Sequence, residues 1–186
     1  MNVLTIDVDY AFSPSISEYD DFVRGSAIEL DLQLEQLEKL GLKPRLNEEK
    51  FSELVSVATK LDKNVQLRKI THHQEILNAL PDCSVTIFNI DHHHDIFYPG
   101  WHDKEILDEG NWVYHLKSCD GYFWIRNKDS EEAPEHDLPF FIRELYMRDL
   151  LSSFPSFDLV VFCASPHWTN AKGEDIVEKL ISYIEV

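Results

Sequence analysis

Positive charge and long apolar runs are both scarce in this chain of 186 residues. Lysine and arginine total 17 against 34 aspartates and glutamates, which gives a formal net charge of −17 at pH 7. Proteins bind phosphate backbones through clustered positive charge, so this composition argues against nucleic acid as a partner. No apolar run approaches the ~20 residues that cross a bilayer, so we expect no membrane partner either.

Cysteine is also scarce. The chain has Cys83, Cys119 and Cys163, whose spacing matches neither a zinc motif nor a redox motif, and an odd number does not fit a disulfide framework. The first residues, MNVLTIDVDY, lack the basic region of a signal peptide. These features predict a cytoplasmic protein.

The remaining composition predicts one folded domain over residues 1–186. Hydrophobic residues make up 44% and charged residues 27%, which excludes a disordered chain and allows a buried core. Short apolar runs predict strands at 3–8, 65–71, 84–90, 111–116, 121–126 and 158–164. Helical patterns lie at 26–40, 47–61, 72–80, 139–153 and 169–184, and the polar segment 127–137 reads as a loop. This alternation predicts an α/β fold with a mainly parallel sheet.

Chemically unusual residues follow three of these predicted strands. Asp7 and Asp9 end the first, and a His72-His73 pair follows the second. The segment DHHHD at 91–95 follows the most apolar strand. Ligands of parallel sheets bind at the carboxyl ends of strands, and alternate residues of an extended segment project to the same side. We therefore expect four carboxylates and two or three imidazoles to converge.

Such a cluster favours bound metal ions. Buried like charges repel and are costly to desolvate, and divalent cations remove that cost. Oxygen and imidazole ligands without a thiolate favour Mn²⁺ or Fe²⁺, with Zn²⁺ as a further option. Six ligands are more than one catalytic zinc takes, so two metals with bridging carboxylates fit better. A lone Asp-x-Asp usually caps a turn; the coincidence of three clusters carries the prediction.

The clusters resemble motifs of the arginase/agmatinase (ureohydrolase) family. The segment 91–95 looks like that family's Asp-x-His-x-Asp motif. The segment IDVD at 6–9, followed by FSP at 12–14, is similar to its second Asp-x-Asp motif. The segment THH at 71–73 resembles its Gly-Gly-Asp-His segment. The resemblance implies a single arginase-like hydrolase domain, a three-layer α/β/α fold and two Mn²⁺ per chain.

The resemblance also implies a set of ligands for each of the two metal ions, and the two sets share two bridging aspartates. The first set is Asp7, Asp91, His73 and Asp95. The second set is Asp7, Asp91, Asp9 and His93. His72 is the alternative to His73, which is preferred because it directly precedes the helical segment 74–77.

The implied chemistry is attack by a metal-activated water on the guanidinium carbon of arginine. Asp95 would orient that water, and a histidine would protonate the leaving amine. His115 matches the family's shuttle histidine in order along the chain, and His167 follows a predicted strand end. His102 is a third candidate.

Several departures from the family bear on the substrate. The Asp-x-Asp strand comes first instead of last, and the chain is short. Cys163 stands where the family has a glutamate that binds substrate. The pattern, with its GNW and SPHW segments, is more similar to the small peptide arginases. These enzymes convert arginine to ornithine during maturation of ribosomally made precursor peptides (RiPP maturation).

The resemblance to peptide arginases implies an arginine-containing precursor peptide as the partner. Trp101, Trp112 and Trp168 are candidates to line a peptide groove, although each could equally belong to the core. No substrate-binding residue is assigned, and the sequence does not predict the oligomeric state.

Three other functions fit the same residues. The first is a deacetylase-like amidohydrolase, which would hold one zinc ion and fewer carboxylates. The second is a two-metal phosphoesterase, although few basic residues lie near the motifs. The third is a metal-stabilised binding module, which chelators would destabilise but which would have no turnover.

Overall fold

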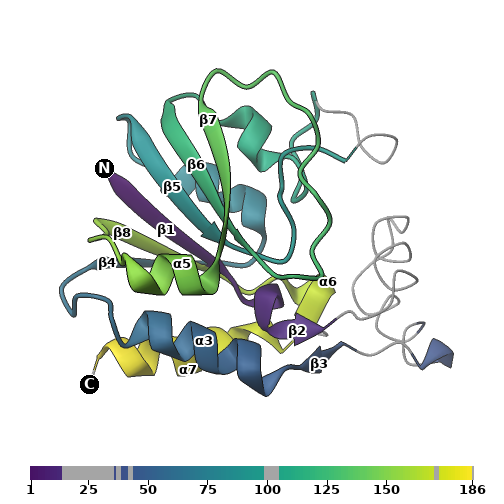
Figure 1. The fold of residues 1–186 in the computed structure, drawn as a ribbon. Helices are drawn as coiled ribbons and strands as arrows, with labels where there is room; N and C mark the ends of the chain where they lie inside the picture. Colours follow the sequence, from purple (N-terminus) through teal and green to yellow (C-terminus); the bar gives the residue numbers. More distant parts are fainter. Residues whose placement is uncertain (14–35, 37–38, 42–43, 99–104, 170–171, 186) are drawn as a thin grey trace.

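The fold was analysed in a computed structural model, which describes residues 1–13, 36, 39–41, 44–98, 105–169 and 172–185 (Figure 1). Its centre is a six-stranded sheet in the order β4-β8-β1-β5-β6-β7, in which every neighbouring pair is parallel. The strands are β1 (Asn2–Asp7), β4 (Gln66–Ile70), β5 (Val85–Ile90), β6 (Cys119–Arg126), β7 (Phe141–Tyr146) and β8 (Leu159–Cys163). A separate antiparallel pair joins β2 (Phe12–Ser13) to β3 (Arg45–Leu46).

Helices connect the strands and cover both faces of the sheet (Figure 1). Among the described residues, the α-helices are α3 (Glu48–Ala58), α4 (Ile76–Ala79), α5 (Met147–Ser152), α6 (Pro166–Thr169) and α7 (Gly173–Ile184). The same residues include three short 3-10 helices, η1 (Val8–Ala11), η2 (His73–Glu75) and η3 (Trp112–His115). Within the described part of the chain, no helix is long and apolar enough to cross a membrane.

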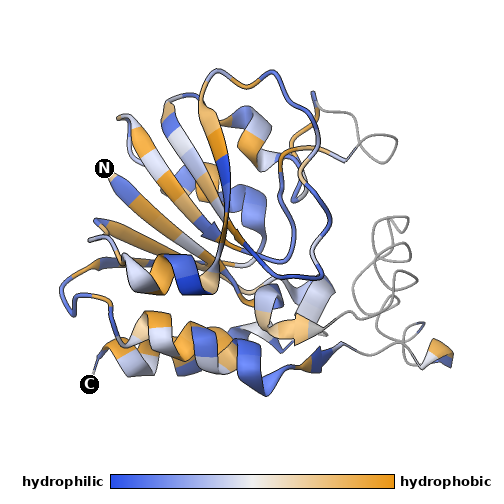
Figure 2. Ribbon diagram, viewed as in Figure 1, coloured by the Kyte–Doolittle hydropathy of each residue, from blue (hydrophilic) through white to orange (hydrophobic). Residues whose placement is uncertain are grey.

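Alternation along the buried strands divides the core into two halves. Leu4 and Ile6 of β1 pack with apolar residues of α3, α5 and α7 on one face. Val3 packs on the other face with residues of α4 and η3. Figure 2 shows apolar colour concentrated on these strands, whereas the segment between β6 and β7 is mostly hydrophilic. The predicted α/β class with a parallel sheet between helices is therefore confirmed.

The helix predicted at 47–61 is present as α3, with a shorter carboxyl end. Asn47 caps it, because its side-chain oxygen accepts hydrogen bonds from the backbone N–H groups of Glu49 and Lys50 at 3.0 and 3.1 Å. Phe51 and Leu54 are among its buried residues and place the apolar side against the sheet. The helix predicted at 26–40 lies almost wholly outside the described residues, as do Trp101 and His102.

Three predicted elements are wrong in type or extent. The predicted strand at 111–116 is the 3-10 helix η3, whose Trp112 and Val113 are both buried although strand neighbours would point to opposite faces. The predicted helix at 139–153 is the edge strand β7 followed by the short helix α5, because β6 supplies hydrogen-bond partners along 141–146. The predicted helix at 169–184 begins at Gly173, after the separate turn α6.

The connections place a switch in direction at the centre of the sheet. From β1 the chain leaves to β4 on one side, whereas from β5 it leaves to β6 on the other side. Ligands of doubly wound sheets bind where two such neighbouring strands end. Ile6 pairs with Ile90 in register, so the residues that follow, Asp7 and Asp91, lie side by side at this point.

Candidate metal centre

The first pair of carboxylates comes from the end of β1. Asp7 is the last residue of the strand, and η1 begins directly after it. The Asp7 side chain caps this turn by accepting a hydrogen bond from the backbone N–H of Asp9 at 2.9 Å. Both carboxylates are buried, so the turn presents them to the protein interior and not to water.

The segment 91–95 after β5 supplies two more carboxylates and an imidazole. The backbone N–H of His93 donates to Oδ1 of Asp91 at 2.8 Å, which holds the start of the segment. Asp95 has a φ of 54°, a left-handed conformation that is uncommon outside glycine. Trp112 stabilises this conformation by donating its indole N–H to Oδ2 of Asp95 at 2.7 Å, and Val113 donates its backbone N–H to the Asp95 carbonyl.

His73 joins these carboxylates from η2. Its Nδ1 lies 2.8 Å from Oδ2 of Asp95, 3.0 Å from Oδ2 of Asp91 and 3.3 Å from Oδ2 of Asp7. On the other side of the ring, Nε2 lies 2.9 Å from the hydroxyl of Thr5. His72 points elsewhere and pairs with Glu109. The structure thus places His73, and not His72, in the cluster.

A second group forms around His93. Its Nδ1 lies 2.8 Å from Oδ2 of Asp9 and 3.9 Å from Oδ1 of Asp91. The ring of Trp168 covers this imidazole at a centroid distance of 4.3 Å. Asp91 therefore directs one oxygen toward His73 and the other toward His93, so a single carboxylate lies between the two groups.

The donor atoms form two overlapping triads, each with its atoms within 4.8 Å of one another. One triad is His73, Asp91 and Asp95. The other is Asp9, Asp91 and His93. All six residues proposed from the sequence as ligands, Asp7 included, are buried and lie together at the switch between β1 and β5.

The electrostatics of the cluster are unfavourable without a cation. Burial raises the pKa of Asp9, Asp91 and Asp95, and neighbouring carboxylates raise the pKa of Asp9 and Asp91 further. Burial alone lowers the pKa of His73, but the facing carboxylates outweigh it and hold the pKa well above its ordinary value. Divalent cations would neutralise the carboxylates and replace the imidazole proton.

The donor set passes a direct test of fit to a metal. Nδ1 of His73 is buried and makes no hydrogen bond of normal geometry, although three carboxylate oxygens lie close to it. When the neutral ring carries its proton on Nε2 and donates it to the Thr5 hydroxyl, Nδ1 has a lone pair that is directed at these oxygens. A lone pair that converges with carboxylates is the arrangement of a metal ligand.

Several residues that support the cluster were not singled out from the sequence. Thr5 lies two residues before Asp7, and this spacing on a strand was the available signal. Asn89 likewise lies two residues before Asp91, and its side-chain amide donates a hydrogen bond to Oδ2 of Asp91 at 3.0 Å. Ser165 donates its hydroxyl to Oδ2 of Asp7, and it reaches that carboxylate only through the loop after β8.

Two tryptophans proposed for a groove lie at the centre, and so does the thiol of Cys163. Trp112 is fully buried and binds Asp95, while Trp168 packs on His93. The Cys163 sulfur, Asp7 and His73 form a third group of donor atoms within 4.8 Å. The ligand set predicted from the sequence contains no thiolate, and this group adds a thiol beside it. Burial raises the pKa of this thiol well above its ordinary value.

The two candidate proton donors lie in different surroundings. The ring of His167 lies 5.7 Å from that of His72, and its neighbours in α6 and the preceding loop contact the cluster through Ser165 and Trp168. His115 ends η3, and its buried Nε2 has no hydrogen-bond partner among the described residues. His167 is therefore linked to the cluster through adjacent residues, whereas His115 is linked only through η3.

Comparisons with protein-family models, with curated proteins and with solved structures found no match for this chain.

Proposed function

We propose that this protein is a di-manganese hydrolase that cleaves the guanidinium group of arginine in a peptide, leaving ornithine and urea. The observation that carries the proposal is the position of Asp91, whose two oxygens face two separate imidazole–carboxylate groups. Carboxylate-rich donor sets with imidazole suit Mn²⁺. Fe²⁺ and Zn²⁺ are the alternative metals. The resemblance of segments 6–9, 71–73 and 91–95 to ureohydrolase motifs supplies the substrate class.

The surrounding residues would hold the ligands in productive orientations. Thr5 holds the Nε2 side of the His73 ring, and Asn89 and the backbone of His93 hold Asp91. Trp112 holds Oδ2 of Asp95. Such supporting contacts typically change metal affinity by about 10- to 100-fold when removed. Their buried positions also keep bulk water from competing for the donor atoms.

Bound divalent cations would supply Lewis acidity and lower the pKa of a bound water. Asp95 would orient this water for addition to the guanidinium carbon. The bond from that carbon to Nε then breaks, the water oxygen remains in urea, and Nε becomes the ornithine amine. The amine needs a proton, and His167 is favoured as its donor because its neighbours contact the cluster. His115 is the alternative donor.

The test is mass spectrometry of arginine-containing peptides incubated with the Mn²⁺-loaded protein. Each event should remove one cyanamide unit from the peptide mass, with urea measured in parallel. Asp91→Asn should abolish both signals, whereas Asp82→Asn, a matched change at an exposed aspartate, should leave them intact. Urea from free arginine or agmatine without any change in peptides would refute the peptide substrate. No urea from any guanidine would refute the reaction.

A one-zinc, deacetylase-like amidohydrolase is the second candidate function, and Cys163 favours it. Its sulfur is near Asp7 and His73, and zinc prefers thiolate and imidazole ligands to carboxylates. The measurement that separates the two is metal content per chain after loading with Mn²⁺ and Zn²⁺ together. Two Mn²⁺ per chain supports the arginase-like proposal. One Zn²⁺, with binding weakened in Cys163→Ser, supports the amidohydrolase.

A further inference from the structure

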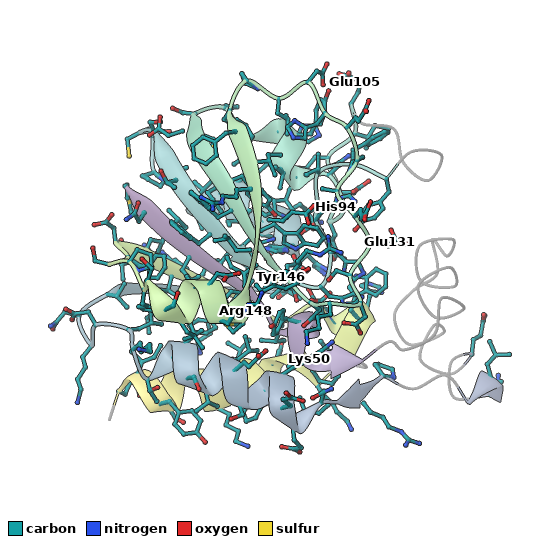
Figure 3. All side chains as sticks on the ribbon, viewed as in Figure 1. Lys50, His94, Glu105, Glu131, Tyr146 and Arg148 are labelled. Atoms are coloured by element: carbon teal, nitrogen blue, oxygen red, sulfur yellow. The ribbon has the colours of Figure 1, made fainter. Side chains whose placement is uncertain are left out.

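A cavity of about 590 Å³ lies at the same edge of the sheet as the metal centre, but over different strands. Its lining comes from Tyr10 of η1, the beginning of α3, and the residues at and just after the ends of β6 and β7. Figure 3 labels three of the lining residues, Lys50, Tyr146 and Arg148, between α3 and the end of β7. Its volume is within the range of about 300–1,000 Å³ that is usual for ligand pockets.

Strand pairing brings two cations to this cavity. Arg126 and Tyr146 are partners in the β6–β7 register. Lys128 and Arg148 each follow two residues later, so both lie beyond the carboxyl ends of neighbouring strands. A chain with a net charge of −17 thus places two lysines and two arginines around one cavity.

Two of the four cations are already neutralised. Lys50 pairs with Asp129 at 3.2 Å, and Arg126 pairs with Glu144 at 2.6 Å. Lys128 is exposed and forms no ion pair with any described residue. The side chain of Arg148 is 82% exposed.

The exposed guanidinium of Arg148 lies over the Tyr146 ring at 5.7 Å, and its Nε forms a long, solvent-exposed ion pair with Oδ1 of Asp149 at 3.8 Å. Lys128 and Arg148 therefore retain charge that a ligand could use.

The lining also contains three carboxylates, one of which, Asp129, is paired with Lys50. Glu49 and Glu53 belong to α3, and Glu53 accepts a hydrogen bond from the Tyr10 hydroxyl at 2.8 Å. The two lining carboxylates that are not paired with Lys50 thus lie on α3, whereas the exposed cations Lys128 and Arg148 lie after β6 and β7. An anionic group would be bound beside Lys128 and Arg148.

The cavity and the metal centre share a wall. Tyr10 lines the cavity and directly follows Asp9 of the centre. Asn127 also lines the cavity; it donates to the Tyr10 carbonyl at 3.1 Å and lies 3.4 Å from Nδ1 of His92. One edge of the sheet thus has the acidic cluster at the ends of β1 and β5 and two exposed cations beyond the ends of β6 and β7.

We propose that Lys128 and Arg148 bind a carboxylate of the same substrate whose guanidinium enters the metal centre. This inference rests on the proposed function. Neighbouring strands lie about 4.8 Å apart, so β7 is about 10 Å from β5, and an extended peptide advances about 3.4 Å per residue. The carboxylate therefore belongs to an acidic residue within about four positions of the target arginine. The other source of such a group is the α-carboxylate of free arginine.

The test compares two peptides that contain one arginine and differ by glutamate or glutamine three positions away. Calorimetric titration without added metal measures binding without turnover, and kinetics with Mn²⁺ give KM and kcat. We expect the glutamate peptide to bind about tenfold more tightly at low salt, since two partly exposed charge contacts contribute about that factor. High salt should reduce the preference because it screens exposed charges.

Reversing the charge of Lys128 and Arg148 tests whether these two residues cause the preference for the glutamate peptide. Lys128→Glu with Arg148→Glu should abolish the preference for the glutamate peptide and raise its KM, with kcat unchanged. Lys117→Glu is the matched control, because Lys117 is exposed before the opposite, amino end of β6. Equal binding of the two peptides, no measurable binding of either, or an equal effect of Lys117→Glu would overturn the inference.

Two further outcomes separate this inference from the proposed function. Preference for the glutamate peptide without any urea release would support the carboxylate site and refute the guanidine reaction. Urea release from both peptides with equal KM would support the reaction and refute the carboxylate site. A preference for free arginine over its amide, lost in the double variant, would overturn the assignment to a peptide side chain and assign the site to an α-carboxylate.

Discussion

The contact between Thr5 and His73 offers the sharpest test of the metal centre. Thr5→Val keeps the shape of the side chain and removes the hydroxyl that lies 2.9 Å from Nε2 of His73. Thr5 is fully buried and His73 is 2% exposed, so water cannot replace the lost partner. The His73 ring then loses the contact that orients it with Nδ1 toward the carboxylates.

The magnitude follows from the kind of contact that is lost. Removing a partner behind a metal-binding histidine typically weakens metal binding about 10- to 100-fold, or about 1.4 to 2.8 kcal/mol. Leaving a buried ring nitrogen without a partner should also lower the free energy of unfolding by about 1–3 kcal/mol. The group formed by Asp9, Asp91 and His93 does not use this ring, so its affinity should fall less.

The assay is calorimetric titration with Mn²⁺, together with thermal unfolding with and without the metal. Thr86→Val is the matched control, because Thr86 lies on the neighbouring strand β5 and makes no side-chain hydrogen bond with a described residue. We expect one of two binding steps to weaken in Thr5→Val and neither to change in Thr86→Val. Unchanged affinity at both steps in Thr5→Val would refute the role of His73 as a ligand.

Three further predictions follow from the same cluster. Asp91→Ala should remove both metals, whereas Asp9→Ala should weaken mainly one; elemental analysis decides, and full occupancy in Asp91→Ala would contradict the ligand assignment. His167→Asn should lower kcat by about 10² with both metals retained, and a larger loss in His115→Asn would reverse the choice of proton donor. Without metal, the raised pKa values of the buried carboxyls and His73 mean that the folded state binds more protons than the unfolded state. Stability should therefore fall as pH rises above the ordinary carboxyl pKa of about 4. Because metal binding displaces protons, Mn²⁺ should stabilise the folded protein more as pH rises. The measurement is thermal unfolding from pH 5 to 8 with and without Mn²⁺. If the melting temperature had the same dependence on pH in both cases, a metal at these residues would be excluded.

Local sequence was sufficient for the features that depend on neighbouring residues. The buried strands β1, β5 and β8 are short runs rich in β-branched and aromatic residues, and such runs are buried on both faces of a parallel sheet. Asn47 marks the start of α3 because a cap acts within one turn. The six candidate ligands could be proposed because residues that follow parallel strands gather at one edge.

Tertiary structure decided the features that depend on partners far along the chain. The segment 141–146 is a strand because β6 offers a free edge, and no local pattern contains that information. Trp112 is a buried donor to Asp95, which required η3 to fold against the segment 91–95. The choice of His73 over His72 was decided in the same way, by which imidazole the turn η2 directs toward Thr5 and the carboxylates.

The sequence carried least information about which residues face one another at the carboxyl edge of the sheet. Ser165 follows β8, yet its hydroxyl reaches Asp7 because β1 and β8 are neighbours in the sheet. Lys128 and Arg148 both line one cavity because β6 and β7 end in register. Residue types and their spacing thus determined which chemistry this chain carries. Strand order and register, which arise from the free energy of packing the whole core, decided which of those residues face one another.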